Sequence, residues 1–282
     1  MDLLTEVQNL CAQYDLEPSK KMGQNYLIDA EVLAEIISTA KIKKTDHIVE
    51  VGPGFGVLTK ELASRAKKVL AVEMDPRAAL AITRLGNIYQ NIEVVTNNIL
   101  TIKNAELLAQ LGSKSYRVIA NIPYQITSRL LRKFLSYDPK PKDLLILVQR
   151  EVAQRVVAKN GQRSLLSLSV QFYGQPTIVT MVPSSSFWPE PDVNSALLHI
   201  IINDDYIKKL KKAKLTEQDF WSLLKASFAG RRKTLVNNLS NSWHCEKKEV
   251  IKILKKLKIN EMARAQDLYL DQWLSLASEV YE

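Results

Sequence analysis

Residues 48–62 read IVEVGPGFGVLTKEL, and this stretch decides how the chain folds. The β-branched residues at its start predict a buried strand, and the apolar spacing at its end predicts a helix. Between them Gly52, Gly54 and Gly56 alternate with other residues. Because glycine has no Cβ, the backbone there can turn tightly and approach a ligand closely. A strand, a glycine-rich turn and a helix in this order are typical of the first unit of a Rossmann-like fold.

The apolar runs that follow predict a mostly parallel sheet with both faces covered, because they alternate with stretches of helical periodicity. We expect parallel strands at residues 47–51, 69–72, 92–96, 117–120 and 144–148. Two further apolar runs, 177–182 and 196–202, have no long helix between them, which indicates an antiparallel hairpin at one edge of the sheet. Before the first strand, Asp29 is placed to cap a helix.

The pattern becomes purely helical after residue 203. We therefore expect an α/β domain over residues 1–203 and a small all-helical domain over residues 204–282. The chain carries a formal charge of +9, and residues 206–260 hold 15 Lys and Arg against four Asp and Glu. A basic block beside a near-neutral body is typical of a module that binds a polyanion. A solvated, lysine-rich helix face is the alternative interpretation.

Several classes of protein are disfavoured by composition. No apolar run approaches the roughly 20 residues that cross a bilayer, and the first ten residues contain no basic side chain, so we expect neither membrane spans nor a targeting segment. Cys11 and Cys245 lie far apart, and His47, His199 and His244 have no metal-ligand spacing. We therefore expect no metal site and no disulfide framework, and a reducing, cytoplasmic location.

Acidic and amide residues after the strands indicate the kind of cofactor. Glu73 ends the second strand, where a carboxylate can accept both hydroxyls of a ribose. The glycines follow a GxGxG spacing instead of the dinucleotide GxGxxG, and Glu50 stands two residues ahead of the first one. This arrangement suits a cofactor without phosphate, S-adenosylmethionine. After the third strand the chain offers Asn97 and Asn98, whose amides can accept a hydrogen bond from an adenine amine.

The fourth strand leads into Asn121, Ile122, Pro123 and Tyr124. An adenine amine is a poor nucleophile because its lone pair is delocalised into the ring. The Asn121 side-chain oxygen and the Ile122 carbonyl can accept the amine hydrogens and free that lone pair. Pro123 fixes the backbone and removes a competing donor, and Tyr124 offers a ring on which an extruded base can stack. Positioning supplies much of the acceleration, so the transfer needs no charged base.

Together these motifs resemble the ribosomal RNA small-subunit adenine dimethyltransferase family, the kasugamycin-resistance type, over essentially the whole chain. The stretches that carry the resemblance are KKMGQNYLID at 20–29, EVGPGFGVLTKEL at 50–62, AVEMD at 71–75, NIPYQITSRLL at 121–131, VQREVAQR at 148–155, FWPEPDVNSALL at 187–198 and FAGRRKTLVNNL at 228–239.

The resemblance implies a Rossmann-like domain that binds S-adenosylmethionine and roles for individual residues in it. Asn25 and Leu27 would contact the methionine portion and the sugar, with Gly52 and its neighbour Gly54 under the methionine portion. Glu73 would hold the ribose hydroxyls. Asn98 stands where the family usually has Asp against the adenine amine.

The resemblance also implies a target. Asn121 would serve both the cofactor and the target base, Tyr124 would stack on that base, and Phe187 is a candidate for its other face. The product would be two adjacent dimethylated adenosines near the 3′ end of the small-subunit RNA, made during subunit biogenesis on an immature small subunit. We expect a monomer. Three cations between two helical segments are candidates for contacts with RNA phosphates: Arg231, Arg232 and Lys233.

Three alternatives stay open. The nearest is the related large-subunit RNA adenine dimethylase that confers macrolide resistance, although FWPEPDVNSALL and FAGRRKTLVNNL favour the small-subunit class. The second is a methylase-derived factor that only grips nucleic acid, against which the presence of Glu73, Asn121 and Tyr124 argues. The third, a nicotinamide dehydrogenase, conflicts with the glycine spacing.

Overall fold

The computed structural model describes residues 2–19, 23–159, 161–230 and 232–281, and its contacts divide the chain into two compact units. The α/β unit comprises Met1–Ala153 and Pro176–Ile202, and the helical unit comprises Gln154–Gln175 and Asn203–Glu282. One boundary thus lies beside the expected division at residue 203. Residues 154–175, however, belong with the C-terminal helices and not with the α/β domain as expected.

Aromatic packing explains why residues 154–175 group with the C-terminal helices. Phe172, on helix α8 (Leu165–Tyr173), stacks on Phe220 with ring centroids 5.0 Å apart. The neighbouring Tyr173 hydroxyl donates a 2.5 Å hydrogen bond to Glu217 and lies beside the Trp221 ring. These contacts join segments about fifty residues apart, so local periodicity gives no sign of them.

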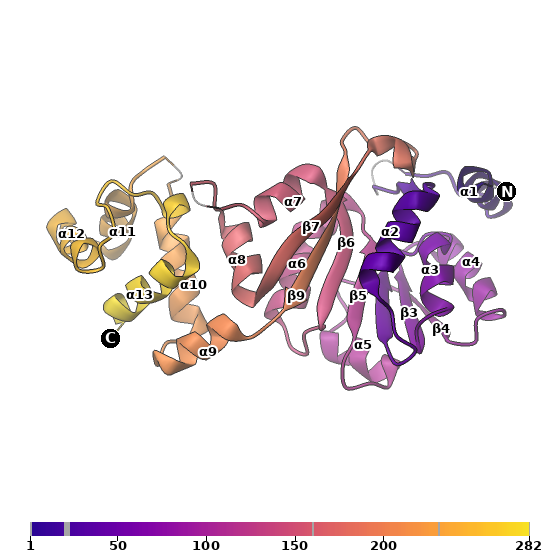
Figure 1. Cartoon of the computed structure of the whole chain (residues 1–282), viewed down its shortest axis with the longest axis horizontal. Coiled ribbons are helices and arrows are strands. Elements are labelled where there is room, and N and C mark those ends of the chain that lie inside the picture. Colours follow the sequence, from indigo (N-terminus) through magenta and orange to yellow (C-terminus); the bar gives the residue numbers. More distant parts are fainter. Residues whose placement is uncertain (1, 20–22, 160, 231, 282) are drawn as a thin grey trace. The chain divides into compact units, whose positions relative to one another are not determined.

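One mostly parallel sheet organises the α/β unit, with strand order β4-β3-β2-β5-β6-β9-β7 (Figure 1). Its strands are β2 His47–Val51, β3 Lys68–Glu73, β4 Ile92–Thr96, β5 Arg117–Asn121, β6 Asp143–Gln149, β7 Gly174–Val182 and β9 Ser195–Ile202. The strands from β4 to β6 pair in parallel, and β9 runs antiparallel to β6. The expected Rossmann-like fold is therefore confirmed, with β9 and β7 at the predicted edge.

Helices cover both faces of this sheet. The described helices of the α/β unit are α1 Leu3–Gln13, α2 Ala30–Ala40, α3 Val57–Ala63, α4 Pro76–Gly86, α5 Asn104–Leu111, α6 Thr127–Ser136 and α7 Arg150–Val156, which continues across the unit boundary. Two 3₁₀ turns, η2 Tyr124–Ile126 and η3 Ser184–Ser186, belong to the same unit. The chain passes from β2 to β4 in one direction and from β4 to β6 in the other. Right-handed crossovers therefore put α3 and α4 on one face and α5 and α6 on the opposite one.

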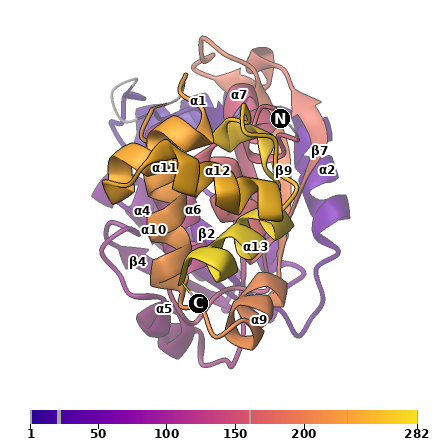
Figure 2. The ribbon, with the colours of Figure 1, turned by 90° about the vertical axis from the view of Figure 1, so that its left-hand side faces the viewer.

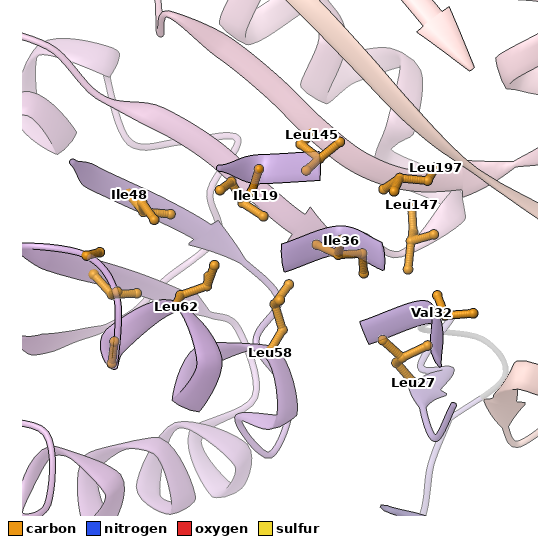
Figure 3. Close-up of a cluster of buried hydrophobic side chains, with 14 of the residues drawn as sticks. Leu27, Val32, Ile36, Ile48, Leu58, Leu62, Ile119, Leu145, Leu147 and Leu197 are labelled. Carbon is orange, nitrogen blue, oxygen red and sulfur yellow. The ribbon is translucent and has the colours of Figure 1, made fainter. Parts of the chain in front are cut away.

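A hydrophobic core packs the helices beside the glycine turn against the sheet. Figure 3 shows side chains of α2 and α3 gathered against those of β2, β5 and β6. Ile36, Leu62 and Ile119 are at most 1% exposed in this cluster. As predicted, Asp29 caps α2, because its carboxylate accepts from the Glu31 and Val32 amides at 2.9 and 3.2 Å. The glycine turn is thus held between a buried strand and a packed helix.

The helical unit is built from short amphipathic helices (Figure 2). Besides α8 they are α9 Asp205–Lys212, α10 Glu217–Ser227, α11 Leu235–Trp243, α12 Lys247–Lys256 and α13 Leu270–Tyr281, with a 3₁₀ turn η4 Ala265–Asp267. Thr216 and Thr234 cap α10 and α11 through their hydroxyls. Trp273 and Leu239 are fully buried in the core of this unit. Among all the helices described, none is long and apolar enough to cross a membrane.

Candidate functional site

The glycine turn has the left-handed backbone conformation that a tight turn of glycines permits. Gly52, Gly54 and Gly56 have φ values of +63°, +57° and +85°, a region that residues with a Cβ rarely adopt. A Cβ on Gly54 would lie 2.7 Å from the Tyr26 ring, and one on Gly52 would lie 3.4 Å from Pro123. The glycines therefore permit both the turn and the close approach of two other segments.

The Glu73 carboxylate ties the end of β3 to this turn. One oxygen accepts a hydrogen bond from the Gly54 amide at 3.1 Å, and the other accepts from the Met74 and Asp75 amides at 2.7 and 2.9 Å. The side chain is nearly buried, at 8% exposure. Burial raises its pKa, whereas the three amide hydrogen bonds oppose that rise. The carboxylate is thus oriented, and Glu73 lines the cavity described next.

A cavity of about 70 Å³ lies above the glycine turn, and it gathers most of the predicted residues. Its wall includes Asn25, Leu27, Gly52, Gly54, Glu73, Asn121, Ile122, Pro123 and Tyr124. A second cavity of about 280 Å³ adjoins it, because Gly52, Glu73 and Pro123 line both, and Asn98 lines the second. Residues from five separated segments therefore meet at the carboxyl ends of parallel strands, where open α/β sheets bind ligands.

The turn after β5 holds its side chains in fixed positions. The Asn121 amide nitrogen donates to the Asn25 carbonyl at 3.0 Å. This bond assigns the orientation of the amide and leaves its oxygen as an acceptor. The Tyr124 hydroxyl and the Ser195 hydroxyl form a 2.6 Å hydrogen bond. Asn121 and Tyr124 are thus both anchored by segments distant in sequence.

Tyr124 also lines a third cavity, of about 380 Å³, together with Gly23, Asn25 and Gln149. The other wall consists of Glu190, Pro191, Asp192 and Val193. This cavity and the first one share Asn25 and Tyr124, so the turn after β5 separates two adjoining spaces. Tyr124, which belongs to this turn, therefore lines both.

Asn98 is oriented by its own backbone. Its side-chain oxygen accepts from the Leu100 amide at 3.0 Å, and the Asn97 oxygen accepts from the Asn98 amide at 2.7 Å. The amide group of Asn98 therefore has its nitrogen left to donate. The sequence alone leaves open whether the oxygen or the nitrogen is available, and the local turn favours the nitrogen.

Phe187 is the predicted site residue that the structure does not bring to these cavities. It lies on the two-residue strand β8 (Phe187–Trp188), which pairs antiparallel with β1 (Tyr26–Leu27). In that register Phe187 is opposite Leu27, and its ring is only 2% exposed within the core. Its buried ring anchors the segment that carries Asn25. We therefore leave Phe187 out of the proposed site.

The predicted cationic run lies in the helical unit. Arg231 is outside the described residues, and Arg232 and Lys233 are exposed in the turn between α10 and α11. The buried Asn238 fixes this turn, because its amide donates to the Ser227 and Gly230 carbonyls at 2.7 and 3.1 Å. The exposed charges thus stand on a well-supported turn.

Three groups in the site are not in the sequence-based set of site residues. Within the described part of the chain, the buried Glu50 Oε2 and Tyr26 hydroxyl have no hydrogen-bond partner, and both residues line the first cavity. Ser195 positions Tyr124. The sequence did contain hints of these three residues. Glu50 stands two residues ahead of Gly52, and Tyr26 and Ser195 lie in the family-like stretches 20–29 and 187–198.

The donor set fits S-adenosylmethionine. The described residues around the first cavity include two acidic side chains, the Glu73 carboxylate and Glu50, whose raised pKa keeps it protonated, and no Lys or Arg. Such a wall suits a ligand with cationic sulfonium and ammonium groups and disfavours a pyrophosphate. A bound ligand could also form hydrogen bonds with the two unpartnered groups, Glu50 Oε2 and the Tyr26 hydroxyl, and could lie against the glycine turn. No cluster of metal-ligating side chains occurs within the described residues.

The Rossmann-like sheet, the glycine turn and this wall define an S-adenosylmethionine-dependent methyltransferase. A family model described as ribosomal RNA adenine dimethylase matches residues 17–282, and the chain belongs to that family. It is 39% identical to "Ribosomal RNA small subunit methyltransferase A" of Dehalococcoides mccartyi strain 195, over 97% of this chain and 92% of the relative. The protein of the same name from Clostridioides difficile strain 630 is 36% identical, over 94% and 92%.

Solved structures agree with this assignment. A dimethyladenosine transferase from Plasmodium falciparum is 27% identical, with a TM-score of 0.72 over 89% of this chain and 95% of that one. The 23S rRNA methyltransferase ErmE is 25% identical, with a TM-score of 0.71 over 92% and 100%. The fold is therefore shared by a dimethyladenosine transferase and by a 23S rRNA methyltransferase.

Proposed function

We propose that this protein dimethylates the 6-amino groups of two adjacent adenosines near the 3′ end of the small-subunit ribosomal RNA. The observation that carries the proposal is the Asn121 amide. Its nitrogen is engaged by the Asn25 carbonyl at 3.0 Å, so its oxygen is available to an amine in the adjoining cavity. A hydrogen-bond acceptor at that point draws the amine hydrogens away from the ring plane and frees the lone pair for attack.

The other residues of the turn have complementary roles in the proposal. The Ile122 carbonyl is the second acceptor for the amine. Pro123 has no amide hydrogen, so it offers no competing donor at that point. Its ring lies where a Cβ on Gly52 would be in contact with it. Tyr124 stacks on the extruded adenine in the third cavity, and Ser195 holds its hydroxyl in place.

The first and second cavities hold the cofactor in this proposal. S-adenosylmethionine supplies an electrophilic methyl group on a sulfonium. Glu73 accepts the ribose hydroxyls, and Asn98 meets the adenine edge. Backbone at Gly52 and Gly54 lies under the methionine portion, which Asn25 and Leu27 also contact. Glu50 Oε2 and the Tyr26 hydroxyl are buried polar groups without a partner among the described residues, and both residues line the first of these cavities.

The small-subunit target is supported by the names of the curated relatives, which match almost the full length of this chain. The large-subunit alternative is supported by the ErmE structure, which is 25% identical. We further propose that the substrate is an immature small subunit, that the enzyme acts in the cytoplasm and that it acts as a monomer.

In the same proposal the helical unit binds RNA phosphates, with Arg231, Arg232 and Lys233 as candidate contacts. Two exposed residues of this run lie next to Gly230, whose carbonyl is fixed by Asn238. A cation on an ordered turn loses less conformational freedom on binding than one on a mobile segment.

The test of the catalytic assignment is Asn121→Ala. Removing an acceptor needed when the amine attacks should abolish nearly all methyl transfer to immature small subunits, while RNA binding stays close to that of the unchanged protein. Asn87→Ala, at the exposed end of α4, is the matched control and should transfer methyl groups normally. A loss of only two- to threefold in the Asn121 variant would overturn the assignment.

A further inference from the structure

A basic hollow of about 700 Å³ lies beside the cofactor cavities of the α/β unit, between the loop after β4 and helix α6. Its walls include four cationic side chains, which are Lys103, Arg129, Arg132 and Lys133. The acidic residue among the described lining residues is Asp138, whose carboxylate lies 3.5 Å from Lys140. The hollow therefore has a net positive wall.

The walls of this hollow are held in place by hydrogen bonds. The Lys133 ammonium is nearly buried and donates to the Ile102 carbonyl. The Asn104 amide donates to the Lys133 and Tyr137 carbonyls at 3.3 and 2.7 Å. These bonds join the loop before α5 to helix α6. Because the Lys133 ammonium is used inside the protein, the charges available to a ligand in the hollow are those of Lys103, Arg129 and Arg132.

Two arginines present their charge to solvent. Arg129 and Arg132 are exposed on α6, and within the described part of the chain neither forms an ion pair. Their spacing of three residues puts them on one face of the helix, about 4.5 Å apart along its axis. Tyr137 is 54% exposed at the end of the same helix and also lines the hollow. Two guanidinium groups and a free aromatic ring are the chemistry that recognises a single nucleic-acid strand.

The hollow is continuous with the proposed active site. Arg129 and Leu100 line both the hollow and the second cavity. Gln125 lines both the second and the third cavity, and it lies four residues before Arg129. A surface path therefore runs from the cavity proposed for the target base, past Gln125 and Arg129, to Arg132 and Tyr137.

An anionic partner is needed to match these arginines. The adenosine end of the cofactor proposed for the second cavity carries no negative charge, so the cofactor gives Arg129 nothing to neutralise. A strand of ribosomal RNA that delivers a base to the third cavity brings a phosphate at every nucleotide. The exposed Tyr137 ring offers a stacking face to one of its bases.

We propose that the hollow between the 100–105 loop and α6 binds the RNA strand that flanks the target adenosine. Arg129 and Arg132 contact successive phosphates, and Tyr137 stacks on a base. This inference rests on the proposed function, because it takes the direction of the strand from the cavity assigned to the target base. It assigns the α/β unit an RNA contact of its own, separate from the cationic run at residues 231–233.

The test is the salt dependence of binding by the full-length protein to immature small subunits. In the double variant Arg129→Gln, Arg132→Gln the slope of log K against log salt should flatten by about 0.7–0.9 for each phosphate that is no longer neutralised. Arg129→Lys with Arg132→Lys keeps both charges and should keep the slope. Tyr137→Ala should weaken binding at every salt concentration without changing the slope, since stacking releases no counterions.

A matched control removes two charges elsewhere on the same unit. Lys43 and Lys114 are exposed and precede β2 and β5, at the amino ends of the strands and away from the site. Lys43→Gln with Lys114→Gln should leave the slope unchanged. The affinity for S-adenosylmethionine, measured by calorimetry, should be unchanged in the Lys43, Lys114 control and in Tyr137→Ala, which lie outside the lining of the cofactor cavities.

Two results would overturn the inference. An unchanged slope in the Arg129, Arg132 double glutamine variant would mean that these are solvated surface charges. A loss of S-adenosylmethionine affinity with an unchanged slope would mean that Arg129 serves the cofactor. Failure of the proposed function is a separate outcome, because it would appear as no methyl transfer to small-subunit RNA by the unchanged protein.

Discussion

Replacing Glu73 with Ala should weaken S-adenosylmethionine binding by about 10- to 140-fold. The carboxylate is 8% exposed and oriented by three amide hydrogen bonds from 2.7 to 3.1 Å, so it meets the ligand as a fixed, charged acceptor. Losing hydrogen bonds to a charged group costs about 1.5–3 kcal/mol, and each 1.4 kcal/mol is roughly a tenfold change in affinity. Glu73 lines both cofactor cavities, and no other acidic side chain is among the described residues around the second one.

Isothermal titration calorimetry of the full-length protein measures this change directly. Thermal unfolding of the same samples separates a weaker affinity from a damaged fold, because the Ala variant leaves the Gly54, Met74 and Asp75 amides without their acceptor. Glu35→Ala, at an exposed position on α2, is the control and should bind like the unchanged protein. Unchanged affinity in a folded Glu73→Ala variant would refute the ribose assignment.

Three further perturbations test other parts of the account. Asn98→Asp should keep or raise S-adenosylmethionine affinity, because one oxygen still accepts from the Leu100 amide and the other replaces the Asn98 nitrogen, which cannot accept from the adenine amine; a large loss in calorimetry would show that this nitrogen is used as a donor to the ring. Burial raises the pKa of Glu50 to about 8 from an ordinary value of 4.5, so the folded protein keeps a proton that the unfolded chain releases. The free energy of unfolding should therefore fall as pH rises between about 4.5 and 8, and Glu50→Gln should remove that fall in urea titrations at pH 5 and 9; a parallel pH dependence in both proteins would contradict this. Changing Arg231, Arg232 and Lys233 together to Gln should flatten the salt slope of RNA binding by at most about 0.7–0.9 for each phosphate that these side chains neutralise, and an unchanged slope would locate the RNA surface elsewhere.

Local sequence pattern predicted the parallel strands well, because each contains a short run of apolar residues such as Val, Ile and Leu. The first and third predicted strands have the bounds that the structure gives to β2 and β4. The grouping of residues 154–175 was not predictable in this way. Phe172 and Tyr173 belong to the helical unit because their rings pack against Phe220 and Trp221, which lie nearly fifty residues away in sequence. A truncation after residue 203 would therefore strip α8 of its aromatic partners.

The site was predictable where a residue type has a chemical reason to follow a strand. Gly52, Glu73 and Asn121 meet in one cavity, as the carboxyl ends of parallel strands require. Phe187 shows the limit of that reasoning. Its burial depends on a two-residue strand that pairs with β1, about 160 residues earlier in the sequence. A strand pair this short produces no periodic pattern from which it could be predicted. The hydrogen bond that orients Asn121 depends on the same segment.

The most direct test of the proposed function is to identify the methylated base. The full-length protein is incubated with labelled S-adenosylmethionine and either immature small subunits or free large-subunit RNA, and the label is mapped. The account predicts N6,N6-dimethyladenosine at two adjacent positions near the 3′ end of the small-subunit RNA, with four methyl groups per subunit. Label on the large-subunit RNA alone, or no transfer to either RNA, would contradict it.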